Sequence, residues 1–204
     1  MQVLTPKLKF VYGPMGSAKT AHLIISAFNF EENGIKPLIL TSAIDTRSAP
    51  GTVSSRIKAL KADAISLDPT SSVFSIAQRA VCHIKDPVRI ILIDEAHFLT
   101  VAQAEETARI VDSLGIPVTA YGLRADFRTE LFPASAKFLA LADSIQELPC
   151  VCPCGAKAIV NARMSDGVVV KEGSQILVGG NETYISLCRK CYNSEPHPNV
   201  PVNH

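Results

Sequence analysis

The sequence lacks an excess of charge of either sign, since 20 lysines and arginines are balanced by 19 aspartates and glutamates in 204 residues. Binding to long nucleic acid needs a broad basic surface, so a polynucleotide is not an expected partner. The sequence also lacks an apolar run long enough to cross a bilayer, and residues 1–6 lack the apolar core of a signal peptide. We therefore expect a soluble cytoplasmic protein with no membrane partner.

Length and composition set the expected domain organisation. A chain of this length, with 47% hydrophobic residues, can hold one α/β core and a small appendage. The composition changes at Leu148, after which short strands, glycine turns and cysteine pairs are expected. We predict a nucleotide-binding α/β domain over 1–147 and a small metal-binding domain over 148–193. Residues 194–204 contain three prolines with little to bury and are expected to be disordered.

An eight-residue segment near the N-terminus has the pattern of a phosphate-binding loop. It lies between an apolar run at 8–12 and a helix-like stretch from Ala21, the context such loops require. Its backbone N–H groups would form an anion nest, Lys19 would reach the outer phosphates of a nucleotide, and Thr20 would bind Mg²⁺. Ala18 stands where the pattern has glycine. The alternative is a chance glycine turn before a helix. The predicted loop residues are Gly13, Pro14, Met15, Gly16, Ser17, Ala18, Lys19 and Thr20.

The alternation of strands and helices predicts a doubly wound parallel sheet, in which ligands bind at the carboxyl ends of the strands. The long segment 42–56, rich in Ser, Thr, Gly and Pro, is expected to be a functional loop, and Arg47 or Arg56 in it can reach a transferring phosphate. The alternative for both arginines is solvated surface charge. Strands are expected at 7–12, 37–41, 63–67, 88–93, 116–121 and 144–148, and helices at 19–32, 72–83, 101–114 and 137–142.

Two acidic residues, Asp94 and Glu95, end the most apolar strand, as in a Walker B element. Asp94 would hold Mg²⁺, and Glu95 is then available as a general base. A solvated carboxylate pair is the alternative. The segment from Asp94 to His97 also spells the DEAH signature of a helicase class, which needs a second motor domain that 204 residues do not accommodate.

Five of the six cysteines lie in the last quarter of the chain, in closely spaced groups. In a cytoplasmic chain such groups indicate a structural Zn²⁺ site rather than disulfides. Cys82, on an expected helix, is assigned to the apolar core. The expected ligands are Cys188 and Cys191, which form C-x-x-C, together with Cys154 and either Cys152 or Cys150, of which we favour Cys152.

Several motifs in the same order resemble the cytosolic (type II) thymidine kinases, over residues 7 to 193. Beside the phosphate loop, they are Asp45-Thr46-Arg47, Gly51 to Arg56, Asp94-Glu95 with Phe98, Tyr121 to Phe127, Gly179-Gly180 with Tyr184, and Cys188 to Tyr192. The resemblance implies a RecA-like form of the P-loop sheet with a small zinc-ribbon-like lasso domain. It also implies transfer of a phosphoryl group from ATP to the 5′-hydroxyl of thymidine, in a homotetramer that its triphosphate end product inhibits.

The same resemblance assigns roles to individual residues. Glu95 matches the catalytic base, and Thr20 and Asp94 match the Mg²⁺ ligands. A lasso loop over 177–181 would cover the base with its backbone groups. The residues implied to surround the nucleoside are Phe98, Leu123, Phe127, Asn161, Val178, Gly179, Gly180 and Tyr184. Two other functions compete with this one: a P-loop ATPase or nucleic-acid motor with a zinc module, and a nucleotide-binding regulator without turnover, which Ala18 keeps open.

Overall fold

A computed structural model describes residues 6–44, 51–57, 60–83, 87–165, 168–175 and 183–194 of the chain. Its largest element is a six-stranded sheet in the order β5-β2-β6-β7-β1-β8, in which every neighbouring pair is parallel. The predicted doubly wound α/β sheet is therefore confirmed. Its strands are β1 (Leu8–Tyr12), β2 (Pro37–Ser42), β5 (Ile65–Leu67), β6 (Ile90–Asp94), β7 (Val118–Gly122) and β8 (Ser144–Glu147).

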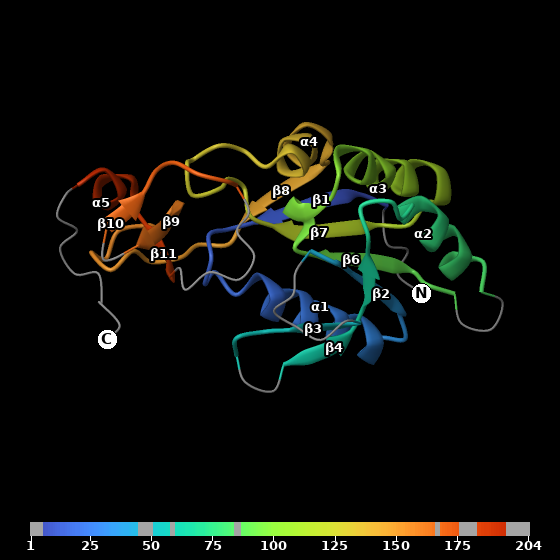
Figure 1. Cartoon of the computed structure of the whole chain (residues 1–204). Helices are drawn as coiled ribbons and strands as arrows, with labels where there is room; N and C mark the ends of the chain where they lie inside the picture. The colour runs from blue at the N-terminus through green and yellow to red at the C-terminus, as the bar shows by residue number, and fades with distance from the viewer. Residues whose placement is uncertain are drawn as a thin grey trace.

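Helices cover both faces of this sheet (Figure 1). One face carries α1, and the other carries α2, α3 and α4. Two apolar clusters result, one on each side, and alternate residues of β6 enter them. Ile91 and Ile93 belong to the cluster under α2, α3 and α4, whereas Ile90 and Leu92 belong to the cluster under α1. The bounds of the helices are α1 (Lys19–Glu32), α2 (Val73–Val81), α3 (Val101–Leu114) and α4 (Pro133–Leu141).

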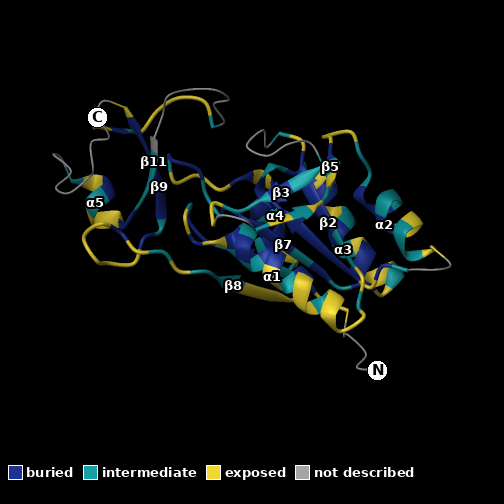
Figure 2. Cartoon of the chain, turned by 90° about the horizontal axis from the view of Figure 1, so that it is seen from below, coloured by how far each residue is buried: buried dark blue, intermediate teal, exposed yellow. Residues whose placement is uncertain are grey.

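Local signals account for the ends of α3. Thr100 and Gln103 form a capping box, in which each side chain accepts a hydrogen bond from the other residue's backbone N–H. At the other end Gly115 adopts the left-handed conformation, with φ 65°, that glycine allows without strain. The predicted bounds of this helix are confirmed. The burial pattern in Figure 2 shows the outer faces of the helices exposed and central strands such as β6 buried, whereas the edge strand β8 is largely exposed.

Four local predictions were wrong. The segment 42–56 contains a strand, β3 (Thr52–Ser54), which pairs antiparallel with β4 (Lys61–Asp63), so the strand predicted at 63–67 is two separate short strands. Helix α4 begins a turn before Lys137, because a proline at the first helical position has no N–H to satisfy. Cys82 is exposed rather than part of the core, since α2 ends at Val81.

The C-terminal part of the chain forms a second, three-stranded antiparallel sheet, at the left of Figure 1. Its central strand is β9 (Val160–Ser165), flanked by β10 (Val168–Val170) and β11 (Thr183–Leu187), and α5 (Arg189–Asn193) follows. These elements enclose an apolar cluster of their own, which includes Cys152 and Tyr192. We refer to the described residues between 148 and 194 as the C-terminal module. The boundary at 147/148 stays a prediction, and residues 195–204 of the predicted tail lie outside the described residues.

Candidate nucleotide site and metal centre

The predicted phosphate loop connects β1 to α1 at the carboxyl end of the sheet. Ala18 has φ 59° and ψ 29°, the left-handed conformation that glycine adopts most easily. Gly13 has no room for a side chain, because an added Cβ would lie 2.5 Å from both Leu148 O and Ser17 Oγ. The loop backbone is therefore tightly packed at Gly13 and conformationally strained at Ala18.

Lys19 lies folded over this loop and is buried. Its ammonium group donates to the carbonyl oxygens of Gly13 and Pro14, each at 2.9 Å, and lies 3.3 Å from Ser17 Oγ. The ammonium group is therefore held at the loop, where its positive charge can also attract a bound anion. The arrangement suits the binding of a phosphate group next to the loop.

Thr20 joins the loop to the acidic end of β6. Its hydroxyl donates a 2.9 Å hydrogen bond to Asp94 Oδ2. Burial, and after it the neighbouring Glu95 carboxylate, raise the pKa of Asp94 to about 7, although the Thr20 hydrogen bond and the charge of Lys19 act in the opposite direction. A hydroxyl and a buried carboxylate at this separation form an oxygen donor pair of the kind that Mg²⁺ takes.

Glu95 begins a 3-10 turn, η1 (Ala96–Phe98), and is one of three non-glycine residues with positive φ among those described. Its φ of 48° is a strained conformation of the sort found at functional sites. Its Oε2 lies 3.4 Å from His97 Nδ1, which also accepts a hydrogen bond from Leu123 N–H. Because Nδ1 accepts that bond, the proton of neutral His97 is on Nε2. His97 thus fixes the position of Leu123 beside Glu95.

The structure brings the predicted nucleoside residues together in two groups. Phe98 and Leu123 are joined through His97, whose ring centroid is 4.0 Å from that of Phe98. Phe127 and Tyr184 are joined through Arg163, whose guanidinium carbon lies 3.7 Å from the Phe127 ring centroid and whose Nε donates to Tyr184 Oη at 2.9 Å.

Arg163 itself was missed by the sequence reasoning. It is 1% exposed, and it also donates to Ser174 O at 3.1 Å. The signal in the sequence was an arginine placed directly between the apolar residues Ala162 and Met164. A buried arginine needs such partners, so its presence indicated a polar cluster inside the C-terminal module.

The loop between β7 and α4 is organised by Asp126, which the motif Tyr121 to Phe127 contained but to which no role was assigned. This carboxylate is 3% exposed and accepts hydrogen bonds from the N–H groups of Arg128 and Glu130, at 2.9 and 3.0 Å. It also accepts from the Arg128 guanidinium at 2.9 Å and from Gln175 Nε2 at 3.1 Å. The adjacent Phe127 is held in place by this network.

Asn161, predicted beside the nucleoside base, has other partners in the structure. Its Oδ1 accepts from Met15 N–H at 2.7 Å, and its Nδ2 donates to Ala125 O at 3.3 Å. Arg56 is exposed and lines a cavity of about 300 Å³ between the phosphate loop and the C-terminal module. The predicted site residues Arg47, Val178, Gly179 and Gly180 lie outside the described residues.

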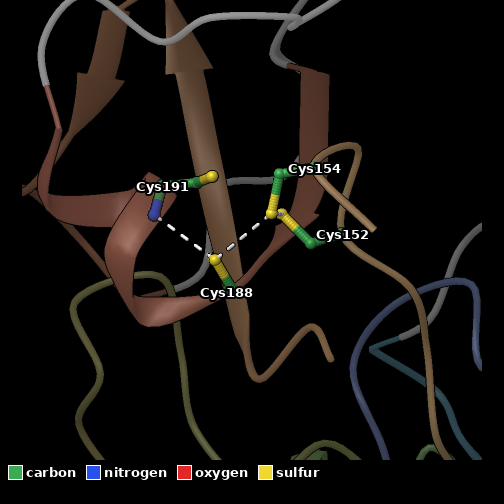
Figure 3. A group of neighbouring side chains, drawn as sticks. All are labelled: Cys152, Cys154, Cys188 and Cys191. Carbon is green, nitrogen blue, oxygen red and sulfur yellow. Dashed lines mark hydrogen bonds between the residues drawn. The ribbon is translucent and has the colours of Figure 1, made fainter. Parts of the chain in front are cut away.

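Four cysteines form a cluster that could hold a metal ion (Figure 3), and they are the four that we favoured. All four Sγ atoms lie within 4.8 Å of one another, with Cys154 Sγ 3.5 Å from Cys152 Sγ and 3.7 Å from Cys188 Sγ. A tetrahedral Zn²⁺ with bonds of about 2.3 Å separates its sulfurs by about 3.8 Å, which these distances match, whereas a disulfide needs about 2.05 Å. Cys150 is excluded from the cluster, since its Sγ contacts Met15 O at 3.6 Å.

The thiols of the cluster shift one another's pKa values in opposite directions. The backbone N–H of Cys191 donates to Cys188 Sγ and lowers the pKa of that thiol to about 7. Hydrogen bonding with Cys154 raises the pKa of Cys191 to about 12. Four sulfur ligands to one ion would leave no open position for catalysis. The cluster is suited to a structural Zn²⁺.

A parallel sheet with a phosphate loop after its first strand, and an acidic strand end bonded to that loop, defines a P-loop nucleotide-binding protein. Comparison with known proteins narrows this class. A family profile described as thymidine kinase matches residues 6–192. Thymidine kinases from Zymomonas mobilis, Rhizobium etli and Lactococcus lactis are 45%, 42% and 44% identical to the chain. These matches cover 90%, 93% and 91% of this chain, and 94%, 94% and 96% of the relatives. The chain belongs to the thymidine kinase family.

Proposed function

We propose that the protein transfers a phosphoryl group from ATP to the 5′-hydroxyl of thymidine. Membership of the thymidine kinase family supports this activity. The single observation that carries the mechanism is the hydrogen bond between Thr20 and Asp94, because it links the phosphate loop to the strand end that bears Glu95. A nucleotide at the loop and a base at the strand end would then share one site.

The proposed reaction assigns a task to each group. The loop N–H groups and Lys19 hold the phosphates, and Arg47 and Arg56 approach the transferring group. Glu95 takes the proton of the 5′-hydroxyl as its oxygen attacks the γ-phosphorus, and the bond to the ADP oxygen breaks. Thr20 and Asp94 would hold Mg²⁺, which neutralises charge that develops on the phosphates.

The nucleoside would lie against the apolar side chains of Phe98, Leu123, Phe127 and Tyr184. Backbone groups of Val178, Gly179 and Gly180 would bind the edge of the base, since glycines allow a close approach.

The C-terminal module would act as a distinct zinc-stabilised domain over 148–193. We further propose a homotetramer in the cytoplasm, feedback by the triphosphate end product, and no polynucleotide partner. Among the described residues, no helix is long and apolar enough to cross a membrane.

A coupled assay of ADP release with ATP, Mg²⁺ and thymidine tests this proposal. We expect release that depends on thymidine, and a loss of roughly 10²–10⁴ in kcat for Glu95→Gln, the usual contribution of a general base. This variant should still bind ATP, because Glu95 is not part of the phosphate loop. A rate of ATP hydrolysis that does not change with thymidine but increases with DNA or RNA would instead identify a nucleic-acid motor.

A further inference from the structure

Both backbone polar groups of Met15, in the phosphate loop, are bound by the C-terminal module. Met15 N–H donates to Asn161 Oδ1 at 2.7 Å, and Ser186 Oγ donates to Met15 O at 2.6 Å. From this we propose that Asn161 and Ser186 are positioning residues for ATP, which orient the phosphate loop from a different sheet. The inference rests on the proposed role of this loop in nucleotide binding.

The planar peptide bond between Met15 and Gly16 determines where the Gly16 N–H points once the Met15 carbonyl is held. In a trans peptide the carbonyl of one residue and the N–H of the next point to opposite sides. Ser186 holds the Met15 carbonyl toward the C-terminal module, so the Gly16 N–H points away from that module. Anion nests are built from such inward N–H groups, and one peptide rotated out of place removes a donor. Ser186 therefore sets the direction of one donor of the nest.

The two side chains are placed as a pair. Asn161 on β9 and Ser186 on β11 are direct cross-strand partners in the antiparallel ladder, and such partners project from the same face of a sheet. Asn161 is 5% exposed, and its second hydrogen bond to Ala125 O restricts its rotation. Ser186 is two residues from Cys188 of the metal cluster, which anchors the end of β11. Both contacts thus come from a rigid support.

A third contact comes from the same module. Cys150 Sγ lies 3.6 Å from Met15 O, and a Cβ added at Gly16 would be 3.8 Å from this sulfur. The C-terminal module therefore packs against the two residues whose shared peptide it orients. We expect ATP affinity to depend on side chains that do not touch ATP.

The experiment measures the Kd of a non-hydrolysable ATP analogue by calorimetry, without thymidine, for Ser186→Ala, Asn161→Ala and the double variant. We expect each single variant to weaken binding about fivefold to tenfold, as for the loss of one hydrogen bond. The double variant should be weaker by less than the product of the two factors, because both side chains hold one residue. Zinc content should stay at the wild-type value in all three.

Ser194→Ala is the matched control, since its hydroxyl donates to Lys190 O within the same module and not to the loop. We expect wild-type affinity for it. Affinities of Ser186→Ala and Asn161→Ala within twofold of wild type would overturn the inference, as would an equal loss in Ser194→Ala. The proposed function fails separately: wild-type enzyme that binds the analogue but releases no ADP with thymidine would refute the kinase activity and leave the loop inference standing.

Discussion

At the scale of single residues, the site combines strained backbone with buried charge. Ala18 and Glu95 both have positive φ without being glycine, at the two ends of the Thr20–Asp94 link. Each such residue costs the fold of order 1 kcal/mol or more, and persists because its surroundings hold it. Asp94 adds the cost of a carboxylate that is 4% exposed. These residues proposed for the chemistry therefore each lower the free energy of unfolding of the protein.

Replacing Ala18 by glycine should relieve one of these strains. We expect Ala18→Gly to raise the free energy of unfolding by about 0.5–1 kcal/mol, after the larger unfolded-state entropy of glycine is subtracted. Urea denaturation measures the change. Ala108→Gly, the same substitution inside α3, should lower stability by about 1 kcal/mol. A loss in both variants would show that the left-handed conformation of Ala18 is not strained.

The raised pKa of Asp94 predicts a pH dependence. Native Asp94 holds its proton up to a pKa of about 7, whereas the unfolded residue releases it near its ordinary pKa of 3.8. The native state therefore binds more protons in this window, and its stability falls as pH rises from about 4 to 7. Asp94→Asn does not titrate, so it should gain stability relative to wild type between pH 5 and pH 8 in magnesium-free urea denaturation. A difference that is constant with pH would contradict this.

At the scale of elements, the loop between β7 and α4 is held by one carboxylate. Asp126 is almost fully buried, and its carboxylate accepts hydrogen bonds from two backbone N–H groups, the Arg128 guanidinium and the Gln175 amide. These protein donors, rather than water, stabilise its negative charge. It lies directly before Phe127, whose ring stacks on Arg163. The shape of the proposed nucleoside pocket depends on this loop.

We expect Asp126→Asn to lower stability by roughly 1.5–3 kcal/mol, the value of a charged hydrogen-bond acceptor. The KM for thymidine should rise more than the KM for ATP, because Phe127 moves while the phosphate loop does not. Steady-state kinetics with each substrate varied in turn separates the two effects. Equal increases in both KM values would show a general loss of structure instead.

Elements with strong local signals could be predicted from sequence, and those set by tertiary contacts could not. The β-branched run predicted the strand β6, shifted by one or two residues at its ends, and the apolar period with the stop at Gly115 gave the bounds of α3. The hairpin of β3 and β4 has only three residues a strand, too short for a hydrophobic period. The partners of Asn161 could not be foreseen, because Met15 is 146 residues away in the chain.

At the scale of the whole molecule, two sheets of different construction meet at the phosphate loop. The large parallel sheet presents the loop and the acidic strand end, and the small antiparallel sheet binds Met15 from the other side. The small sheet has one apolar cluster, in which Cys152 and Cys188 are themselves members of the four-cysteine group, so a bound metal ion would add to its folding energy. Cysteine spacing alone left both Cys150 and Cys152 open as ligands. Only the packing of the small sheet against the phosphate loop separates them.

Metal analysis of two matched variants tests this centre. Cys152→Ser should lose the bound zinc, because the sulfur of Cys152 is part of the four-thiol cluster. Cys150→Ser should keep one zinc per chain, because its sulfur faces Met15 instead. Elemental analysis of the purified proteins gives both values. The opposite result would place Cys150 among the ligands.

The central claim is that a nucleotide at the phosphate loop and the Glu95 carboxylate share one reaction site. The most direct measurement is a crystal structure with thymidine and a non-hydrolysable ATP analogue bound together. We predict a Glu95 carboxylate oxygen about 2.6–3.2 Å from the 5′-oxygen of thymidine, within hydrogen-bond reach. The account would be contradicted if the analogue contacts Lys19 but the 5′-oxygen of thymidine makes no contact with Glu95, either directly or through one water.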